Sequence, residues 1–257
     1  MASLEVELLQ AIADNTDSKD SFYIIVTAKS SSVVTTFSPP FILRQRSNGT
    51  SNEYEMALVG LNTYYSFPNV DKTCNSLTVL QRGSGNRLHL DTGCYEITAI
   101  NREIWQSLWK TEKDAGVTFQ ANVSTLKCIM NIKPGYGVKF NVDNSLAPVL
   151  GFEKKEYSPG THPSENPVDI LKVNSILVYC DIITGSRVDG IEAPIIYHFS
   201  PNVAPGIKIV IEPQQPIYLP ITVDTISRME VWLTDQNKRP IDLRGEKVVL
   251  TFHVRAR

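Results

Sequence analysis

Apolar and polar residues alternate along two runs near the end of the chain. In 227–234 every second residue from Met229 to Leu233 is apolar, and in 247–254 every second residue from Val248 to Val254 is apolar. Alternation with a period of two is typical of antiparallel strands that hold one face against a core. A polar turn separates the runs, so we expect them to form a β-hairpin with Phe252 on its inward face.

Similar short runs recur along most of the chain. Most of the gaps between them carry Gly, Pro, Asn, Asp or Ser, which interrupt strands and favour turns. Many short strands at close spacing predict a sandwich, a barrel or a jelly roll. The expected strands are 22–28, 32–37, 55–61, 76–81, 87–90, 117–121, 125–132, 137–141, 176–183, 194–199, 207–212 and 217–221, followed by the terminal pair.

One segment, 95–109, has helical spacing instead. Its apolar stripe consists of Ile97, Ile100, Ile104 and Leu108. This spacing predicts an amphipathic helix of about four turns, laid over one end or face of the sheet. Trp105 and Trp109 are neighbours at i and i+4 beside the stripe. They either pack against the domain or mark an interface, where tryptophan is enriched.

Two polar segments set the expected domain organisation. Residues 1–20 carry a helical stripe and then a polar tether, which suits either an N-terminal arm that docks on a partner or a helix packed on its own domain. Residues 153–167 are rich in proline and charge and predict an exposed loop. We expect one domain over 21–257 that contains this loop. The stripe of the arm is Leu4, Leu8, Leu9 and Ile12.

Composition narrows the class of protein. The 257 residues are 42% hydrophobic and 20% charged, so the chain can bury a core. A net charge of −2 argues against direct nucleic-acid binding, which needs a basic excess. No run approaches the ~20 apolar residues of a membrane span, and no signal peptide opens the chain. The four cysteines form no CxxC pair, and we expect free thiols.

The sequence shows no catalytic or metal-binding motif. The four histidines are not within metal-ligand spacing of one another or of a cysteine, and no GxSxG or HExxH motif occurs. The run Gly83-Ser-Gly85 reads as a hairpin turn and not as a phosphate loop. Asp181 is flanked by apolar residues, and we expect its carboxylate to be buried and hydrogen-bonded. We therefore predict no enzyme, and no catalytic, cofactor-binding or metal-binding residue.

Six phrases follow one another between Glu53 and Arg257. They are EYEMALVGLNTYYSFPNV (53–70), LDTGCYEITAINREI (90–104), LAPVLGF (146–152), ILVYCDIITGSRVDG (176–190), PIYLPI (216–221) and RGEKVVLTFHVR (244–255). In this order they resemble the penton-type minor capsid proteins of Polinton/Maverick elements and the related adintoviruses. Cys94 departs from that pattern, which has an aromatic or charged residue there.

The resemblance implies a single jelly roll that forms a homopentamer at the five-fold vertices of an icosahedral shell. Its neighbours would be trimers of a double-jelly-roll major capsid protein. The protein would then lie in the virion, be made and assembled inside the host cell, and catalyse nothing. Two other functions remain open from the residues. One is a jelly-roll carbohydrate or adhesion module, in which Tyr64 or Tyr65 stacks on sugars; the other is a cupin-type metal enzyme.

Overall fold

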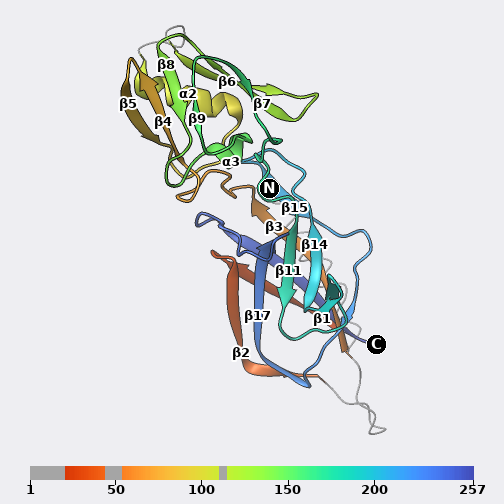
Figure 1. Cartoon of the computed structure of the whole chain (residues 1–257). Coiled ribbons are helices and arrows are strands. Elements are labelled where there is room, and N and C mark those ends of the chain that lie inside the picture. Colours follow the sequence, from red (N-terminus) through yellow and green to blue (C-terminus); the bar gives the residue numbers. More distant parts are fainter. Residues whose placement is uncertain (1–20, 44–53, 110–114) are drawn as a thin grey trace. The chain divides into compact units, whose positions relative to one another are not determined.

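The computed structural model describes residues 21–43, 54–109 and 115–257 (Figure 1). Antiparallel strands dominate these residues, which form two compact units. One unit contains the chain up to residue 65 together with 174–257, and the other contains 66–173. We call them the roll unit and the inserted unit. The chain leaves the roll unit after residue 65 and returns to it at residue 174. That the two units act as the one domain expected over 21–257 stays a prediction.

The roll unit is built from two antiparallel sheets. The first has the strand order β1-β18-β3-β15, with β16 also paired to β3, and the second has the order β14-β11-β17-β2. A ribbon of β12 and β13 follows β11. The strands are β1 (Ser21–Ala28), β2 (Ser32–Ile42), β3 (Tyr54–Tyr64), β11 (Ile176–Cys180), β12 (Arg187–Val188), β13 (Ile191–Glu192), β14 (Ile195–Phe199), β15 (Lys208–Ile211), β16 (Leu219–Pro220), β17 (Thr225–Asp235) and β18 (Val248–Ala256).

The strand order identifies the fold of this unit. Without β16 and the ribbon, eight described strands remain, and in chain order they form the sheets 1-8-3-6 and 2-7-4-5. This is the arrangement of a jelly roll, in which successive strands change sheet at every connection except the one between the fourth and fifth strands. The predicted fold class, an all-β single jelly roll or antiparallel β-sandwich, is therefore confirmed. The inserted unit occupies the connection between the third and fourth of these strands, β3 and β11.

The last two long strands do not form the β-hairpin that their sequence predicts. β17 pairs with β2 and β11, whereas β18 pairs with β1 and β3, so the two lie in different sheets. Their connection, 236–247, crosses from one sheet to the other, and their apolar faces both point into the core between the sheets. The predicted inward residues are all buried, with at most 2% exposure: Met229, Val231, Leu233, Val248, Leu250, Phe252 and Val254.

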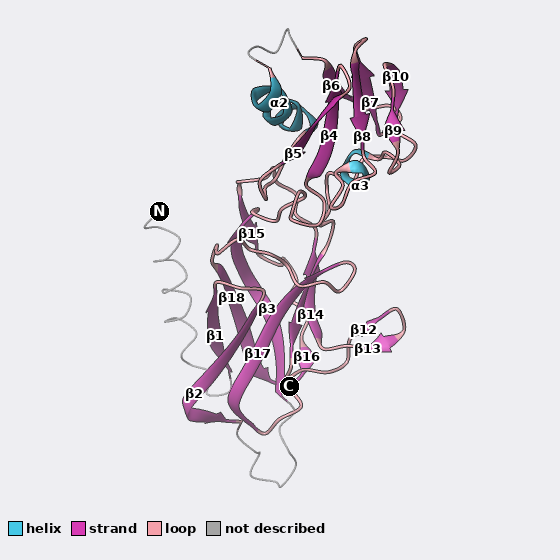
Figure 2. Cartoon of the chain, turned by 60° about the vertical axis from the view of Figure 1, so that its left-hand side comes forward, coloured by secondary structure: helices cyan, strands magenta, loops and turns pink. Residues whose placement is uncertain are grey.

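The inserted unit has two small sheets and both described helices (Figure 2). The sheets have the orders β5-β4-β8-β9 and β10-β7-β6. The rings of Phe119, Phe140 and Phe152 meet at its centre, with centroids 5.5–6.5 Å apart. Its elements are β4 (Ser76–Gln81), β5 (Ser84–His89), α2 (Ile97–Leu108), β6 (Val117–Asn122), β7 (Lys127–Ile132), β8 (Tyr136–Lys139), α3 (Ala147–Leu150), β9 (Glu156–Tyr157) and β10 (Gly160–Pro163).

The helix predicted over 95–109 is α2. Ile97, Ile100 and Ile104 of its stripe are buried, as the spacing predicts. Asn101 joins the helix to β6, because its side-chain amide donates to the Phe119 carbonyl at 2.5 Å and its oxygen accepts the Phe119 N–H at 2.7 Å. None of the helices in the described part of the chain has the length and apolar character needed to cross a membrane.

The two ends of the inserted unit are tied together. The Asn69 side chain donates to the Ile170 carbonyl at 3.0 Å, and the Lys172 ammonium forms an ion pair with Asp71. Burial tends to raise the pKa of Asp71, but the hydrogen bonds from Lys172 and Thr73 outweigh it and lower that pKa to about 2. The segments that enter and leave the unit are therefore held side by side by a charged pair and an amide.

Two smaller expectations differ from the structure. The segment 153–167 is largely exposed but is not a plain loop, because β9 pairs with β8 and β10 pairs with β7. Asp181 is exposed instead of buried, since it follows the end of β11 and accepts hydrogen bonds from the Glu230 N–H and from Arg228. The hairpin expected at Gly83-Ser-Gly85 joins β4 to β5; Arg82 and Gly83 form its turn, and Ser84 and Gly85 already belong to β5.

Candidate interaction surfaces

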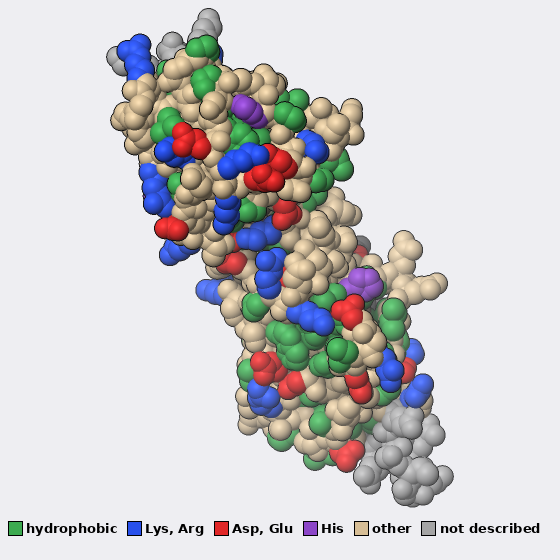
Figure 3. Space-filling model, viewed as in Figure 1, with side chains coloured by type: hydrophobic (Ala, Val, Ile, Leu, Met, Phe, Trp, Pro, Cys, Tyr) green, Lys and Arg blue, Asp and Glu red, His purple; other side chains and the backbone are tan. Residues whose placement is uncertain are grey.

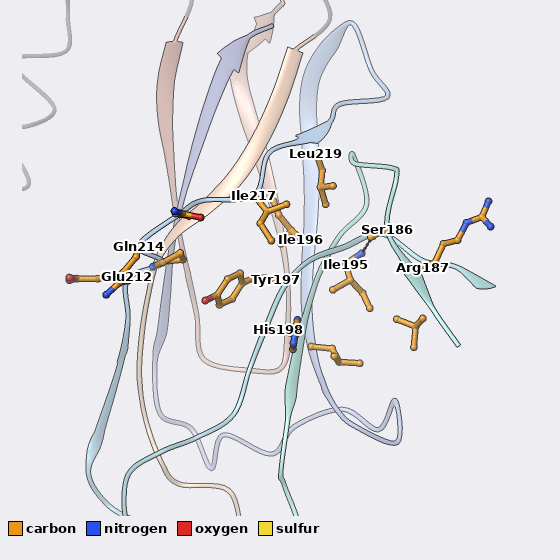
Figure 4. Close-up of a pocket in the computed structure, with 14 residues that line it drawn as sticks. Ser186, Arg187, Ile195, Ile196, Tyr197, His198, Glu212, Gln214, Ile217 and Leu219 are labelled. Atoms are coloured by element: carbon orange, nitrogen blue, oxygen red, sulfur yellow. Dashed lines mark hydrogen bonds between the residues drawn. The ribbon is translucent and has the colours of Figure 1, made fainter. Parts of the chain in front are cut away.

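A groove lies beside β14, at the edge of the second sheet of the roll unit (Figure 4). Its volume is about 790 Å³. We call it the edge groove. Three separate segments form its walls: β14 with Leu177 of β11, the start of the β12 ribbon, and the connection from β15 to β16. No local sequence signal marks it, because its lining comes from residues about 40 positions apart along the chain.

The floor of the edge groove is apolar and its margins are charged. Leu177, Ile195, Ile196, Ile217 and Leu219 provide most of the apolar lining. Arg187 and Glu212 lie on opposite sides of the groove (Figure 4). Figure 3 shows hydrophobic side chains gathered over the sheet that contains β11 and β14. Such a surface suits contact with an apolar partner more than it suits catalysis.

Ser186 holds the ribbon side of the groove in place. Its hydroxyl accepts the Ile195 N–H at 2.9 Å and donates to the Ala193 carbonyl. The backbone before β14 is therefore tied to the backbone before β12, and these are two of the groove's three walls.

A cluster on the first sheet supports the third wall. The Tyr218 hydroxyl lies 2.7 Å from His253 Nδ1, and the Arg255 guanidinium lies over the Tyr218 ring at 3.5 Å. Arg255 also pairs with the buried Glu55 at 2.7 Å. Tyr218 stands between Ile217 and Leu219, so the cluster anchors the segment that lines the groove.

Burial is the main cause that lowers the pKa of His253 below its ordinary value, and the charge of Arg255 lowers this pKa further. The imidazole is therefore neutral at pH 7, and its Nδ1 can accept a hydrogen bond from the Tyr218 hydroxyl. Its Nε2 is buried and has no hydrogen-bond partner among the described residues.

The opposite flank of the roll unit is formed by β1 and β2, which are in contact. Lys29 is the only charged residue between positions 21 and 43. β2 is an edge strand of eleven residues, and natural edge strands usually carry charges, prolines or bulges that prevent pairing with other chains. In β2 the prolines lie in the irregular stretch between Thr36 and Phe41, so residues 32–36 are a regular edge with neither charge nor proline. Such an edge indicates a surface that is covered when the protein functions.

Aromatic side chains gather on this flank. The Phe22 ring stacks on Phe41 with centroids 5.1 Å apart, and Phe37 meets Phe41 edge-on at 5.2 Å. Phe41 is 39% exposed and the adjacent Ile42 is 76% exposed. We call Phe22, Phe37, Phe41 and Ile42 the aromatic flank. The charge-free run in the sequence was a signal that could have located it.

Of the residues predicted to contact partners, only Trp105 and Trp109 lie in the part of the chain that the structure describes. The arm stripe of Leu4, Leu8, Leu9 and Ile12 lies outside the described residues. Trp109 packs against the core of the inserted unit, and its ring lies 5.8 Å from that of Tyr136. Trp105 is half-buried on α2. An interface role for Trp105 therefore stays a prediction.

The structure also shows which residues could serve the two alternative functions, carbohydrate binding and metal catalysis. Tyr64 is 46% exposed at the end of β3, whereas Tyr65 is buried at 6%, so only Tyr64 could stack on a sugar. The described residues contain no group of three or more potential metal ligands. All four cysteines are free thiols.

Comparisons with known proteins match solved structures but no family model. No family model matches the chain, and no curated protein matches it. The crystal structure of the selenomethionine-labelled mavirus penton protein aligns with a TM-score of 0.48 and 12% identity, over 92% of this chain and 100% of that one. The D2–D3 domains of the flagellar cap protein FliD from Escherichia coli align with a TM-score of 0.19 and 12% identity, over 84% of this chain and 100% of that one.

Proposed function

We propose that this chain is a structural capsid protein of the penton type. In this proposal five copies form a ring at each five-fold vertex of an icosahedral virion. The ring is surrounded by trimers of a double-jelly-roll major capsid protein. The function depends on shape and contact surfaces, and the chain performs no reaction.

The observation that carries the proposal is the position of the penton-like phrases on the jelly roll. The phrase ending at Val70 contains β3 and the exit into the inserted unit, and the phrase 176–190 contains β11, where the chain has re-entered the roll. Two more phrases cover β16 and β18. The resemblance therefore includes three of the eight jelly-roll strands, β3, β11 and β18, and the exit into the inserted unit, and is not confined to one local motif.

A ring supports this function only if two different flanks of the protomer are complementary, because a five-fold junction is heterologous. Each junction should bury at least about 1,000 Å² to be specific. The roll unit offers two candidate flanks, the edge groove and the aromatic flank, at opposite ends of its sheets.

The first 20 residues have a separate proposed role. We propose that the stripe of Leu4, Leu8, Leu9 and Ile12 docks on a neighbouring copy or on the major capsid protein. The polar residues 15–20 would serve as the tether. Binding of the arm after the roll has folded would lock the vertex.

Co-expression with a double-jelly-roll major capsid protein tests the function. We expect closed particles in which cryo-electron microscopy places this chain at the five-fold vertices. Particles made without the chain should have open vertices. Closed particles whose vertices are complete in its absence would contradict the proposal, and micromolar binding of a glycan that is lost in Tyr64→Ala would favour the carbohydrate-binding alternative.

A further inference from the structure

We infer that the aromatic flank of one copy docks into the edge groove of the next copy, and that this contact is the repeating junction of the ring. The inference rests on the proposed function, to which it adds the two surfaces and the way they meet. The occupant of each surface is thus a second copy of this chain.

The two surfaces lie where a head-to-tail junction requires them. β1 and β2 are edge strands on one side of the roll, and β15 and β14 are edge strands on the other. A contact between the two sides leaves one free flank at each end of a growing chain of copies, which a rotation can close into a ring. A contact of either flank with itself would stop at a dimer.

The shapes and polarities of the surfaces are complementary. The aromatic flank presents stacked rings and the side chain of Ile42, which is 76% exposed. The edge groove is a hollow of about 790 Å³ with an apolar floor, where Ile217 is 63% exposed. Large exposed apolar side chains on both surfaces cost free energy in a lone protomer and are covered together in this contact.

Charges at the margins favour one orientation. The Leu43 N–H donates to the Asp224 carbonyl at 3.0 Å, so Asp224 lies beside the Ile42 end of the aromatic flank. Lys29 follows the other end of β1, about 20 Å from Phe22 at the rise of a strand. Arg187 and Glu212 lie on opposite sides of the groove (Figure 4). Docking that brings Asp224 to Arg187 also brings Lys29 toward Glu212.

The edge strands add a backbone contribution. β2 and β14 are the two outer strands of the same sheet, and each has one side without a partner strand among the described residues. If the regular part of β2 in one copy, residues 32–36, lies along β14 of the next, its unpaired N–H and C=O groups can bond across the junction, as in strand addition to a sheet edge. Pro39 and Pro40 have no N–H, so the rest of β2 contributes through its side chains. The absence of charge on β2 is then explained, because a buried charge there would be costly.

Two single substitutions test the junction. Ile42→Asp alters the aromatic flank and Ile217→Asp alters the groove, and both residues are exposed enough that the isolated fold should tolerate them. Val123→Asp is the matched control, since Val123 is 82% exposed on the inserted unit. We expect the wild type and the control to form pentamers by native mass spectrometry, and each of the other two variants to be monomeric at the same concentration.

Mixing the two variants distinguishes a head-to-tail junction from any other. The Ile42→Asp copy retains its groove and the Ile217→Asp copy retains its flank, so a one-to-one mixture has one intact junction. We expect a mixed dimer of twice 28.7 kDa, trapped by a lysine-reactive cross-linker, and no larger ring. The chain that carries both substitutions should not join it.

The outcomes separate this inference from the proposed function. Variants that remain pentameric, or a mixture with no more cross-linked dimer than either variant alone, overturn the junction and leave the penton function intact. A wild type that stays monomeric throughout contradicts the ring itself. Folding of each variant is checked by its circular dichroism spectrum, and a variant that fails this check is replaced by Ile42→Ser or Ile217→Ser.

Discussion

Replacing Phe252 with alanine should strongly destabilise the roll unit. Phe252 has no solvent exposure, and its neighbours in register are Ile24 of β1 and Leu58 of β3. Truncation of a buried phenylalanine costs about 3–5 kcal/mol through lost burial and the cavity that remains. β18 is hydrogen-bonded to a strand on each side, so the backbone cannot move in to fill the cavity, and we expect the upper half of that range.

Urea denaturation measures this change in the free energy of unfolding. A loss of about 4–5 kcal/mol corresponds to a fall in melting temperature of roughly 8–20 °C for a domain of this size. Hydrogen exchange read by mass spectrometry should show the lost protection in the sheet of β1, β3 and β18 and not in the inserted unit. Thr27→Ala is the control, because Thr27 is exposed on β1. A cost below about 1 kcal/mol, or an equal cost for the control, would refute this assignment of the inward face.

Three further predictions concern the inserted unit and the arm. Gly151 has φ +79°, and a Cβ there would lie 2.2 Å from the Asn166 carbonyl oxygen, so Gly151→Ala should cost more than the roughly 1–3 kcal/mol of left-handed strain alone. Gly206→Ala is the control for backbone strain without a clash, because Gly206 has φ +82° and open space around it. If the two substitutions lower the free energy of unfolding in urea equally, the clash at Gly151 is contradicted. Asp71 has its pKa lowered to about 2, so the stability that its pair with Lys172 provides is present above about pH 4 and lost as the pH falls toward 2. Between pH 4 and pH 2 the free energy of unfolding of Asp71→Asn should fall less than that of the wild type. The same fall in both proteins would contradict the stabilising role of the pair. Deleting residues 1–20 should leave the melting temperature nearly unchanged while impairing assembly with the major capsid protein, and a drop of several degrees would instead indicate a helix packed on its own domain.

Local elements could be predicted well from the sequence. Every strand expected from alternation has a counterpart in the structure, and the helical stripe of Ile97, Ile100 and Ile104 is buried as its spacing requires. Period-two and helical patterns report which face of an element is buried, and that information is local. The inward face of β18 could therefore be assigned without a structure.

Pairing and domain boundaries could not be predicted in the same way. β17 and β18 are adjacent in sequence and both alternate, but alternation does not say whether two strands share a sheet or face each other across a core. The inserted unit uses the same kind of short strands as the roll, so composition does not change at residues 65 and 174. The proline-rich run 153–167, predicted to be an exposed loop within one domain, lies inside the inserted unit.

The interaction surfaces were the hardest to foresee. The sequence allows Trp105 and Trp109 either to pack against the domain or to form an interface, and Trp109 packs against its own unit. The edge groove forms where β14, the ribbon and the β15–β16 connection lie together in the fold. The sequence pattern of any one of these segments does not predict that they lie together. The aromatic flank does have a sequence signal, the absence of charge around Lys29, and it becomes informative only when β2 is known to be an edge strand.

The oligomeric state of the purified full chain tests the central claim most directly. Native mass spectrometry over a range of concentrations should show a species of five times 28.7 kDa, about 143 kDa, that dissociates to monomers on dilution. A closed ring with head-to-tail junctions predicts few intermediates between one and five copies. A stable dimer or trimer as the sole assembly, or a monomer at every concentration, would contradict the assignment of this chain to a five-fold vertex.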